Sequence, residues 1–190
     1  MRFASMRNLD ISNGEGVGVS LFVQGCDRHC FNCFNPDTWD FNGGKEWTEE
    51  TKNKFIKLID RPYINRISVL GGEPLAEQNL DEVLSLIKEI RISFPEKTIW
   101  LYTGFEWNEI MNYKIKADLC EDNTSFEKHI KEDLSMIKRK NIISNVNVLV
   151  DGEYIDEQKD LTLKWRGSSN QCVIDVQKSI TQNKVVLYCD

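Results

Sequence analysis

Four short apolar runs along the chain predict buried β-strands. Each run is rich in β-branched or aromatic residues and ends at or just before a glycine: residues 20–25, 67–70, 98–103 and 146–151. Runs of this length bounded by turn residues are typical of buried strands. Because helical patterns separate the runs, we expect the strands to pair in parallel through right-handed crossovers, which predicts an α/β fold.

Two amphipathic helices are predicted between the first three runs. Thr48 followed by Glu49 and Glu50 is typical of a helix N-terminus, and Asn79 with Glu82 three residues later matches a capping box. Apolar residues then recur at helical spacing. They are Phe55, Ile56 and Ile59 in the first helix, and Leu80, Val83, Leu84, Ile87 and Ile90 in the second.

The later part of the chain predicts one more helix and an edge hairpin. Residues 112–143 are more polar, and Thr124 with Glu127 predicts the start of a helix. Its apolar residues share one face: Phe126, Ile130, Leu134 and Ile137. Two β-prone runs in the tail, 173–176 and 185–188, are expected to pair as a hairpin. Without an internal repeat or linker, we expect a single domain over residues 1–190, with a helical insertion at about 112–143.

The length, charge and apolar content of the chain indicate which kinds of partner and cellular location to expect. A chain of 190 residues is long enough to bury most of its apolar surface without disulfides or metal. The net charge of −6 and the pI near 5.1 argue against a protein that binds a phosphate backbone, so no nucleic-acid partner is expected. No apolar stretch approaches the roughly 18 residues of a membrane span, and the N-terminus has no apolar signal segment. We therefore expect a cytoplasmic protein without a membrane partner.

Three of the six cysteines fall within eight residues, at Cys26, Cys30 and Cys33. The other three are scattered, which does not resemble the disulfide pattern of a secreted protein. The tight spacing suits thiolates that bind one inorganic centre. A [4Fe-4S] cluster normally has four cysteine ligands, so three ligands leave one iron open to another molecule. The loop follows the first predicted strand, and sites in α/β folds lie at the carboxyl ends of strands.

Two other interpretations of the cysteines remain open. A structural zinc site accepts three cysteines with a histidine or a distant cysteine, although His29 directly precedes Cys30 and is poorly placed for the same tetrahedron. The thiols can also be buried without any metal. The scattered Cys120, Cys172 and Cys189 have no ligand spacing, and we expect them to contribute packing.

The Cys-x3-Cys-x2-Cys spacing after a strand resembles the signature of radical S-adenosylmethionine enzymes. Gly71-Gly72-Glu73, about 40 residues later and after the next strand, resembles their GGE motif, whereas alone it is typical of a simple turn. The resemblance implies a [4Fe-4S] cluster whose fourth iron binds S-adenosylmethionine. Electron transfer then yields a 5'-deoxyadenosyl radical, which abstracts a hydrogen atom.

Five further segments resemble the activating proteins of anaerobic ribonucleoside-triphosphate reductases. They occur in order at residues 13–16, 35–39, 102–105, 148–152 and 165–171. The resemblance covers roughly residues 8 to 172 and implies a partial, open (β/α) barrel. It also implies a glycyl radical formed on the large catalytic subunit of the reductase, and an electron from a small carrier such as flavodoxin.

Site residues follow from this resemblance one position at a time. Cys26, Cys30 and Cys33 are implied to ligate the cluster, Gly72 and Glu73 to contact the methionine end, and Asn32 and Phe34 to lie near the adenine; no catalytic residue beyond these is expected. Glu73 is also expected to offset the ammonium charge.

Several positions depart from the family pattern or stay ambiguous. Asn32 stands where many radical enzymes have an aromatic residue, and Gly18 stands where an arginine is often found. Trp165 and Arg166 are expected either to contact S-adenosylmethionine or the partner, or to tie down a loop. Trp39 and Trp100 are expected in the core.

Two alternative functions are kept. The first is an activase of another glycyl-radical enzyme, such as pyruvate formate-lyase. The second is a non-catalytic protein with a structural site of three cysteines.

Overall fold

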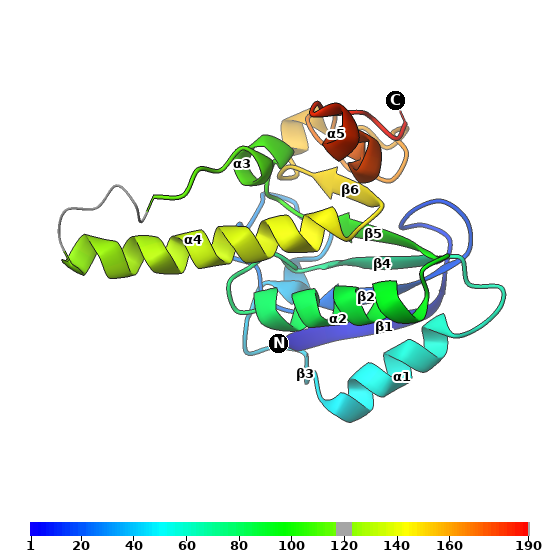
Figure 1. Ribbon diagram of the computed structural model, residues 1–190. Coiled ribbons are helices and arrows are strands. Elements are labelled where there is room, and N and C mark those ends of the chain that lie inside the picture. The colour runs from blue at the N-terminus through cyan, green and yellow to red at the C-terminus, as the bar shows by residue number, and fades with distance from the viewer. Residues whose placement is uncertain (117–122, 190) are drawn as a thin grey trace.

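The computed structural model describes residues 1–116 and 123–189, and a seven-stranded open sheet forms its centre (Figure 1). The order across the sheet is β3-β1-β2-β4-β5-β6-β7. The strands are β1 (Arg2–Asp10), β2 (Gly18–Val23), β3 (Lys45–Glu46), β4 (Arg66–Gly71), β5 (Thr98–Tyr102), β6 (Val148–Asp151) and β7 (Cys172–Asp175).

The four predicted strands are the parallel centre of this sheet. β2, β4, β5 and β6 pair in parallel, which confirms the α/β fold and the pairing expected from the alternating pattern. β1, β3 and β7 add antiparallel pairs at the two sides. β1 was not evident in the sequence because it carries no apolar run, and its side chains are largely exposed along one stretch. Its pairing with β2 holds it in the sheet.

Three helices cover one face of the sheet: α1 (Glu49–Ile59), α2 (Leu80–Ser93) and α4 (Asn123–Ser144). Figure 1 shows α2 and α4 side by side in front of the strands, with α4 extending well past them. The main core lies between these helices and alternate residues of the central strands. Its fully buried members include Phe55, Ile59, Ile67, Leu86, Leu101 and Leu149. Thr48 caps α1 as predicted, accepting a hydrogen bond from Thr51 N.

The opposite face of the sheet carries a smaller apolar cluster. Trp100, Val148, Val150 and Val173 form it, which confirms Trp100 as a core residue. Trp165 and Tyr188 pack edge-on against Trp100, with ring centroids 4.9 and 5.2 Å away. Loops and the C-terminal segment, rather than the three large helices, therefore line this face.

The shorter elements connect these layers. α3 (Trp107–Met111) follows β5, α5 (Val176–Gln182) follows β7, and two 3-10 turns are η1 (Pro36–Thr38) and η3 (Asp156–Gln158). The two runs in the tail do pair as predicted, since Asp175 N donates to Val186 O at 2.9 Å and Tyr188 N donates to Val173 O at 2.7 Å, but α5 rather than a tight turn connects them. The second run still returns beside β7, through a bridge between Ile174 and Leu187.

Two predicted features of the helices differ in detail. Asn79 is at the N-cap of α2, but the predicted capping box does not form. Its side chain instead donates to Gln24 O and Glu73 O, both at 3.0 Å. In α4, Leu134 and Ile137 on the predicted apolar face are exposed, whereas Met136 is buried. The side chains at 123–126, and Cys120, lie outside the described residues.

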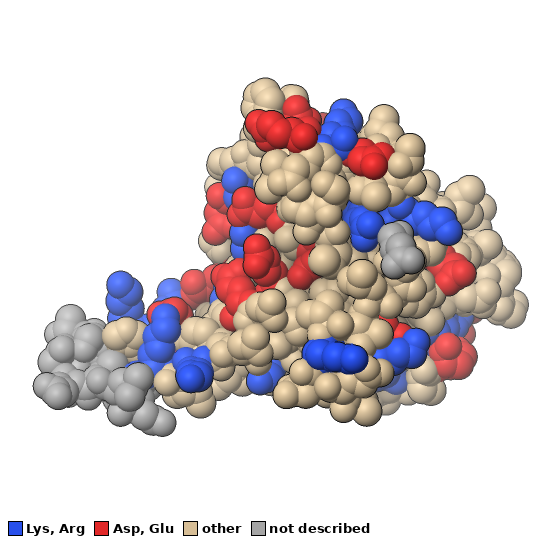
Figure 2. Space-filling view, turned by 90° about the horizontal axis from the view of Figure 1, so that it is seen from above, with Lys and Arg blue, Asp and Glu red and all other residues tan. Residues whose placement is uncertain are grey.

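Acidic and basic side chains are mixed over the face of the molecule that Figure 2 shows from above. Several basic side chains lie on the arm formed by α4 at the left of that view. Within the described ranges, no helix has the length and apolar character that crossing a membrane requires.

Candidate functional site

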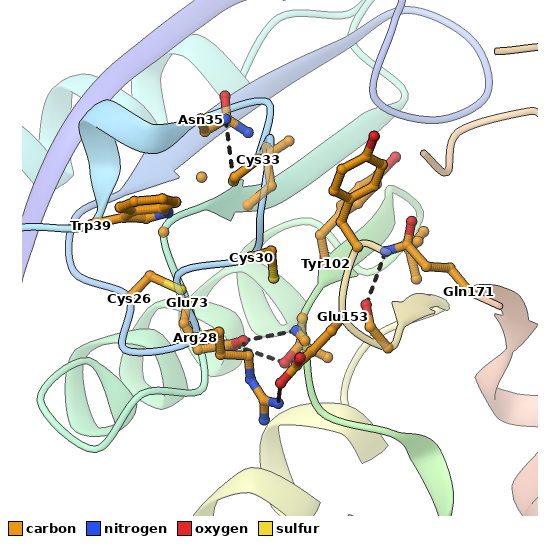
Figure 3. A pocket seen from close by; sticks show the side chains of 18 residues that line it. Cys26, Arg28, Cys30, Cys33, Asn35, Trp39, Glu73, Tyr102, Glu153 and Gln171 are labelled. Atoms are coloured by element: carbon orange, nitrogen blue, oxygen red, sulfur yellow. Dashed lines mark hydrogen bonds and ion pairs between the residues drawn. The ribbon is translucent and has the colours of Figure 1, made fainter. Parts of the chain in front are cut away.

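The cysteine loop begins directly after β2 and lines a cavity of about 140 Å³ (Figure 3). Cys26, Cys30 and Cys33 are free thiols, half-buried, and all three line this cavity. His29 and Asn32 have φ values of 48° and 54°, in a left-handed region that non-glycine residues rarely occupy. The backbone therefore winds tightly enough to turn all three thiols toward one space.

The Gly71-Gly72 segment at the end of β4 packs against the start of this loop. Gly72 N donates to Val23 O at 3.0 Å, and Glu73 N donates to Gly25 O at 2.8 Å. A Cβ at position 72 would lie 2.5 Å from Gly25 O, so only glycine fits here. Both glycines line the cavity beside the thiols. The two sequence motifs thus form one site.

Glu73 is one of the residues that line this cavity, although only 1 % of its surface is exposed. One carboxylate oxygen accepts from Thr103 Oγ1 at 2.7 Å and Leu75 N at 2.9 Å, and the other accepts from Gly104 N at 2.8 Å. Burial raises the pKa of Glu73, and these hydrogen bonds with the Arg28 charge oppose that rise. The carboxylate is thus engaged in joining the ends of β4 and β5.

Arg28 links the cysteine loop to three strand ends, a role that the sequence did not reveal. Its guanidinium pairs with Glu153 after β6 and lies 3.7 Å from the Glu73 carboxylate. It also stacks 4.1 Å from the ring centroid of Phe105, and a side chain on Gly104 would collide with it. These contacts fix one side of the cysteine loop over the sheet.

Burial raises the pKa of Cys26 to about 11 and also raises the pKa of Cys30. The thiols of Cys26 and Cys30 therefore hold their protons near neutral pH. A metal centre that binds these thiols must displace their protons, so its binding releases protons and depends on pH.

A second cavity of about 580 Å³ adjoins the first. The residues that line both are Cys33, Asn35, Leu70, Tyr102, Val150, Tyr154 and Gln171. The second cavity continues along the sheet face that the large helices leave uncovered. It is bounded by Ser12 and Asn13 on one side and by the segment Trp165–Gly167 on another.

Phe34 and Asn32, the two residues expected near adenine, differ from each other in their position relative to the cavities. Phe34 lines the second cavity, with its ring 5.0 Å from that of Tyr154. Asn32 is exposed and does not line either cavity; its side chain donates to Asp156 Oδ2 at 2.9 Å. Trp39 was expected in the core, but it lines the first cavity and its ring lies 4.7 Å from that of His29.

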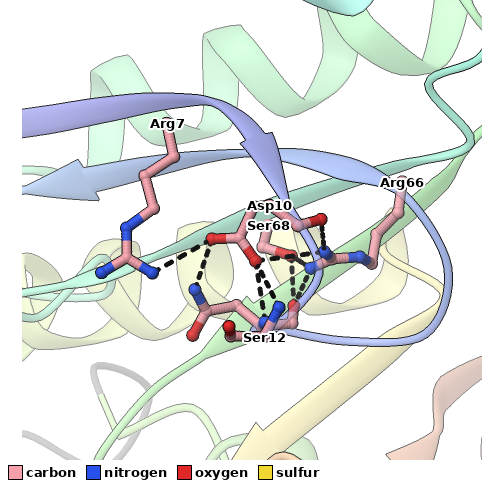
Figure 4. Close-up of polar contacts among 6 residues, drawn as sticks. Arg7, Asp10, Ser12, Arg66 and Ser68 are labelled. Atoms are coloured by element: carbon pink, nitrogen blue, oxygen red, sulfur yellow. Dashed lines mark hydrogen bonds and ion pairs between the residues drawn. The ribbon is translucent and has the colours of Figure 1, made fainter.

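A buried ion pair fixes the loop that carries Ser12 and Asn13 (Figure 4). Asp10 accepts from Ser12 N and Asn13 N at 2.8 and 2.9 Å, and pairs with Arg66 at 3.3 Å. Arg66 also donates to Asn13 O and Asp10 O. Both side chains of the pair are fully buried. The cavity wall is thus held from behind by charges that water does not reach.

Gly18 explains how Arg66 fits there. The two residues are register partners on β2 and β4, and a Cβ at Gly18 would lie 2.9 Å from Arg66 Cζ. The arginine that the resemblance leads one to expect at position 18 is thus absent, and a guanidinium from the next strand occupies the space beside it.

Comparisons with known proteins agree with this geometry. Residues 12–174 match the family model described as a 4Fe-4S single cluster domain. The chain is 34% identical over 175 residues to the anaerobic ribonucleoside-triphosphate reductase-activating protein of Salmonella typhi, covering 91% of this chain and 97% of that protein. The chain belongs to the family of anaerobic ribonucleoside-triphosphate reductase-activating proteins. The proteins of the same description from Escherichia coli K12 and Enterobacteria phage T4 are 33% and 31% identical, over 91% and 90% of the chain and 97% and 92% of those proteins.

Membership of this family bears on the alternatives. The three relatives are described as activating proteins of a ribonucleoside-triphosphate reductase. Their descriptions therefore do not favour the alternative function, the activation of pyruvate formate-lyase. Among residues 1–116 and 123–189, no three His, Cys, Asp or Glu side chains gather closely enough to hold one metal ion.

Proposed function

We propose that this chain uses a [4Fe-4S] cluster and S-adenosylmethionine to generate a glycyl radical on an anaerobic ribonucleoside-triphosphate reductase. The observation that carries the proposal is that Cys26, Cys30 and Cys33 line one cavity together with Gly72. Three thiols from one loop fit a cluster with one open iron. When bound, the reduced cluster supplies the electron that cleaves S-adenosylmethionine, and the product radical removes hydrogen from a glycine Cα.

The residues around the cavity have distinct parts in this proposal. The three cysteines hold the cluster, and the backbone of Gly72 meets the methionine end because no side chain blocks its approach. Glu73 keeps the strand ends in place through its hydrogen bonds. Phe34 and Tyr154 present aromatic rings to the adenine and keep water from the reacting atoms. Asn32 supports the loop through Asp156.

The proposal extends to the fold and the cellular setting. The open sheet, with helices on one face and the cavities on the other, supports a partial (β/α) barrel in a single domain, with the helical insertion ending in α4. The partners are the large catalytic subunit of the reductase and a small electron carrier such as flavodoxin, without nucleic acid or membrane. Free thiols suit the reducing cytoplasm.

Electron paramagnetic resonance on anaerobically reconstituted protein tests the proposal. The reduced wild-type cluster is expected to give a [4Fe-4S] signal that shifts when S-adenosylmethionine is added, and then a glycyl-radical doublet when the reductase is present. Cys30→Ala removes a proposed ligand, and is expected to lose both the cluster signal and the doublet. Cys189→Ala is the matched control, because this thiol packs beside Trp100 outside the cavities, and it should retain both. A cluster indifferent to S-adenosylmethionine would contradict the proposal.

A further inference from the structure

Arg166 is a cation on the wall of the second cavity, and in the described part of the chain its charge acts over a distance on Asp160 and Cys172. It makes no hydrogen bond or ion pair there, and its Nε is buried without an acceptor. The nearby Asp160 carboxylate accepts instead from Thr162 N and Oγ1, at 2.8 and 2.6 Å. A guanidinium carries only donors, and a buried donor without an acceptor is costly. An acceptor that comes from outside the chain would satisfy it.

Hydrogen bonds of Gln171 and Asn170 hold the residues that follow Arg166 in place. Gln171 Oε1 accepts from Gly167 N at 2.9 Å and Ser168 N at 3.2 Å, while Gln171 Nε2 donates to Gly152 O at 2.9 Å. Asn170 donates to Glu153 O at 2.8 Å. Arg166 itself is not needed to tie the loop down, which was one expectation from the sequence.

The backbone next to Arg166 is strained. Trp165 has a φ of 59°, a conformation that a bulky aromatic residue seldom adopts. Its ring is held between Trp100 and Tyr188. The fold thus maintains an unfavourable conformation at the position that directs Arg166 to the cavity.

The position of Arg166 favours one kind of ligand. It does not line the first cavity, where Gly72 and the three thiols lie, so it stands away from the proposed methionine end. The lining of its own cavity includes the apolar Leu70, Val150 and exposed Leu161, beside polar residues such as Asn13 and Gln171. A main-chain segment that entered this space would leave water, and its carbonyl groups would need donors.

We infer that Arg166 is a specificity-determining residue that donates hydrogen bonds to main-chain carbonyls of the glycine-bearing segment of the reductase. The inference rests on the proposed function. It assigns the second cavity, beyond the part that holds the adenosine, to an extended peptide, and it gives Arg166 no part in binding S-adenosylmethionine.

Two dissociation constants test this assignment on the full chain with its cluster, measured by calorimetry without reductant. Arg166→Gln is expected to raise the Kd for the reductase by about tenfold or more, the cost of one lost charged hydrogen bond, while the Kd for S-adenosylmethionine stays within about twofold. Lys164→Gln removes an exposed charge two residues away and should change neither constant. Under reducing conditions, Arg166→Gln should form more 5'-deoxyadenosine per glycyl radical than the wild type.

The opposite results are equally clear. If Arg166→Gln weakens S-adenosylmethionine binding and leaves reductase binding intact, Arg166 belongs to the cofactor site and the inference fails; it also fails if neither constant changes. Should Arg166→Gln not fold, Arg166→Met, which keeps the aliphatic stem but removes the charge and the donors, carries the same comparison. A wild-type chain that forms no glycyl radical would refute the proposed function. If the wild type forms the radical but the two Kd values of Arg166→Gln behave in either of these contrary ways, only this inference is refuted.

Discussion

At the scale of single residues, Glu73 joins elements that are far apart in the sequence. Its two carboxylate oxygens accept hydrogen bonds from Leu75, Thr103 and Gly104, and Arg28 lies close to one of them. A buried carboxylate is stable only when donors replace the water that it has lost. The glutamate of the GGE motif therefore braces the strand ends at the cavity that it lines.

Glu73→Gln should destabilise the protein by about 3 kcal/mol, because an amide nitrogen would then face main-chain and hydroxyl donors in a buried site. Chemical denaturation followed by circular dichroism under anaerobic conditions measures this change. Glu77→Gln provides the control, since Glu77 pairs with Lys131 at the exposed surface and should change stability by less than about 1 kcal/mol. Equal stability of the two variants would show that the buried hydrogen bonds of Glu73 contribute little.

At the scale of elements, α4 shows how tertiary contacts choose the face of a helix that is buried. The sequence groups Ile130, Leu134 and Ile137 on one face, yet Leu134 and Ile137 remain 53% and 44% exposed. The packed face instead contains Met136 and the buried Asp133, whose carboxylate accepts from Tyr113 Oη at 2.8 Å. The contact with Tyr113 and the core around Met136 thus hold this face of the helix inward.

Two truncations on α4 should differ in their cost. Met136→Ala removes a buried side chain and should destabilise the protein by about 2 to 3 kcal/mol, whereas Leu134→Ala at an exposed position should stay within about 0.5 kcal/mol. Thermal unfolding of both variants gives the comparison. A larger loss from Leu134→Ala would mean that the predicted apolar face, and not the face with Met136, is the one that packs.

At the scale of the whole molecule, the cavity is assembled from segments at both ends of the chain. The loop at 11–17 is held by Asp10 and Arg66, and Tyr188 near the C-terminus donates to Glu15 in that same loop. Tyr188 also packs against Trp165 beside the proposed peptide site. The ion pair of Asp10 and Arg66 therefore supports the wall of the second cavity as well as the fold.

The stability of the molecule should depend on pH through Asp10. Burial by itself would raise the pKa of Asp10, but hydrogen bonds from Asn13 and Ser12 outweigh it and bring the pKa well below its usual range. A lowered pKa in the folded state means that the carboxylate adds stability above its ordinary pKa near 4, and that this stability is lost as the pH falls below about 4.

Asp10→Asn should therefore be less stable than the wild type by about 3 kcal/mol at pH 7, with the difference shrinking as the pH falls from 5 to 3. Denaturation curves at several pH values measure it. Asp60→Asn, at an exposed position, should stay within about 0.5 kcal/mol of the wild type at pH 7. A difference between Asp10→Asn and wild type that is independent of pH would contradict the assigned charge state.

Much of the fold could be predicted because its signals are local. The four central strands, the starts of α1 and α2, and the parallel pairing all follow from short apolar runs, helical spacing and capping residues. β1 was missed because its stability comes from pairing with β2 and not from its own apolar character. The two runs in the tail pair as predicted, but a helix connects them because Val176 is buried in the core and the residues after it are helical.

The candidate site divides in the same way. The sequence by itself determined the three cysteines and the glycine motif, because covalent spacing places thiols in one loop and because only glycine permits the close approach at position 72. Tertiary structure alone decided what surrounds them. It brought Arg28 to Glu153, Arg66 into the space left by Gly18, and Arg166 to a cavity wall without an acceptor. These contacts depend on side chains separated by tens of residues, and their partners are selected by burial and geometry that no local pattern in the chain records.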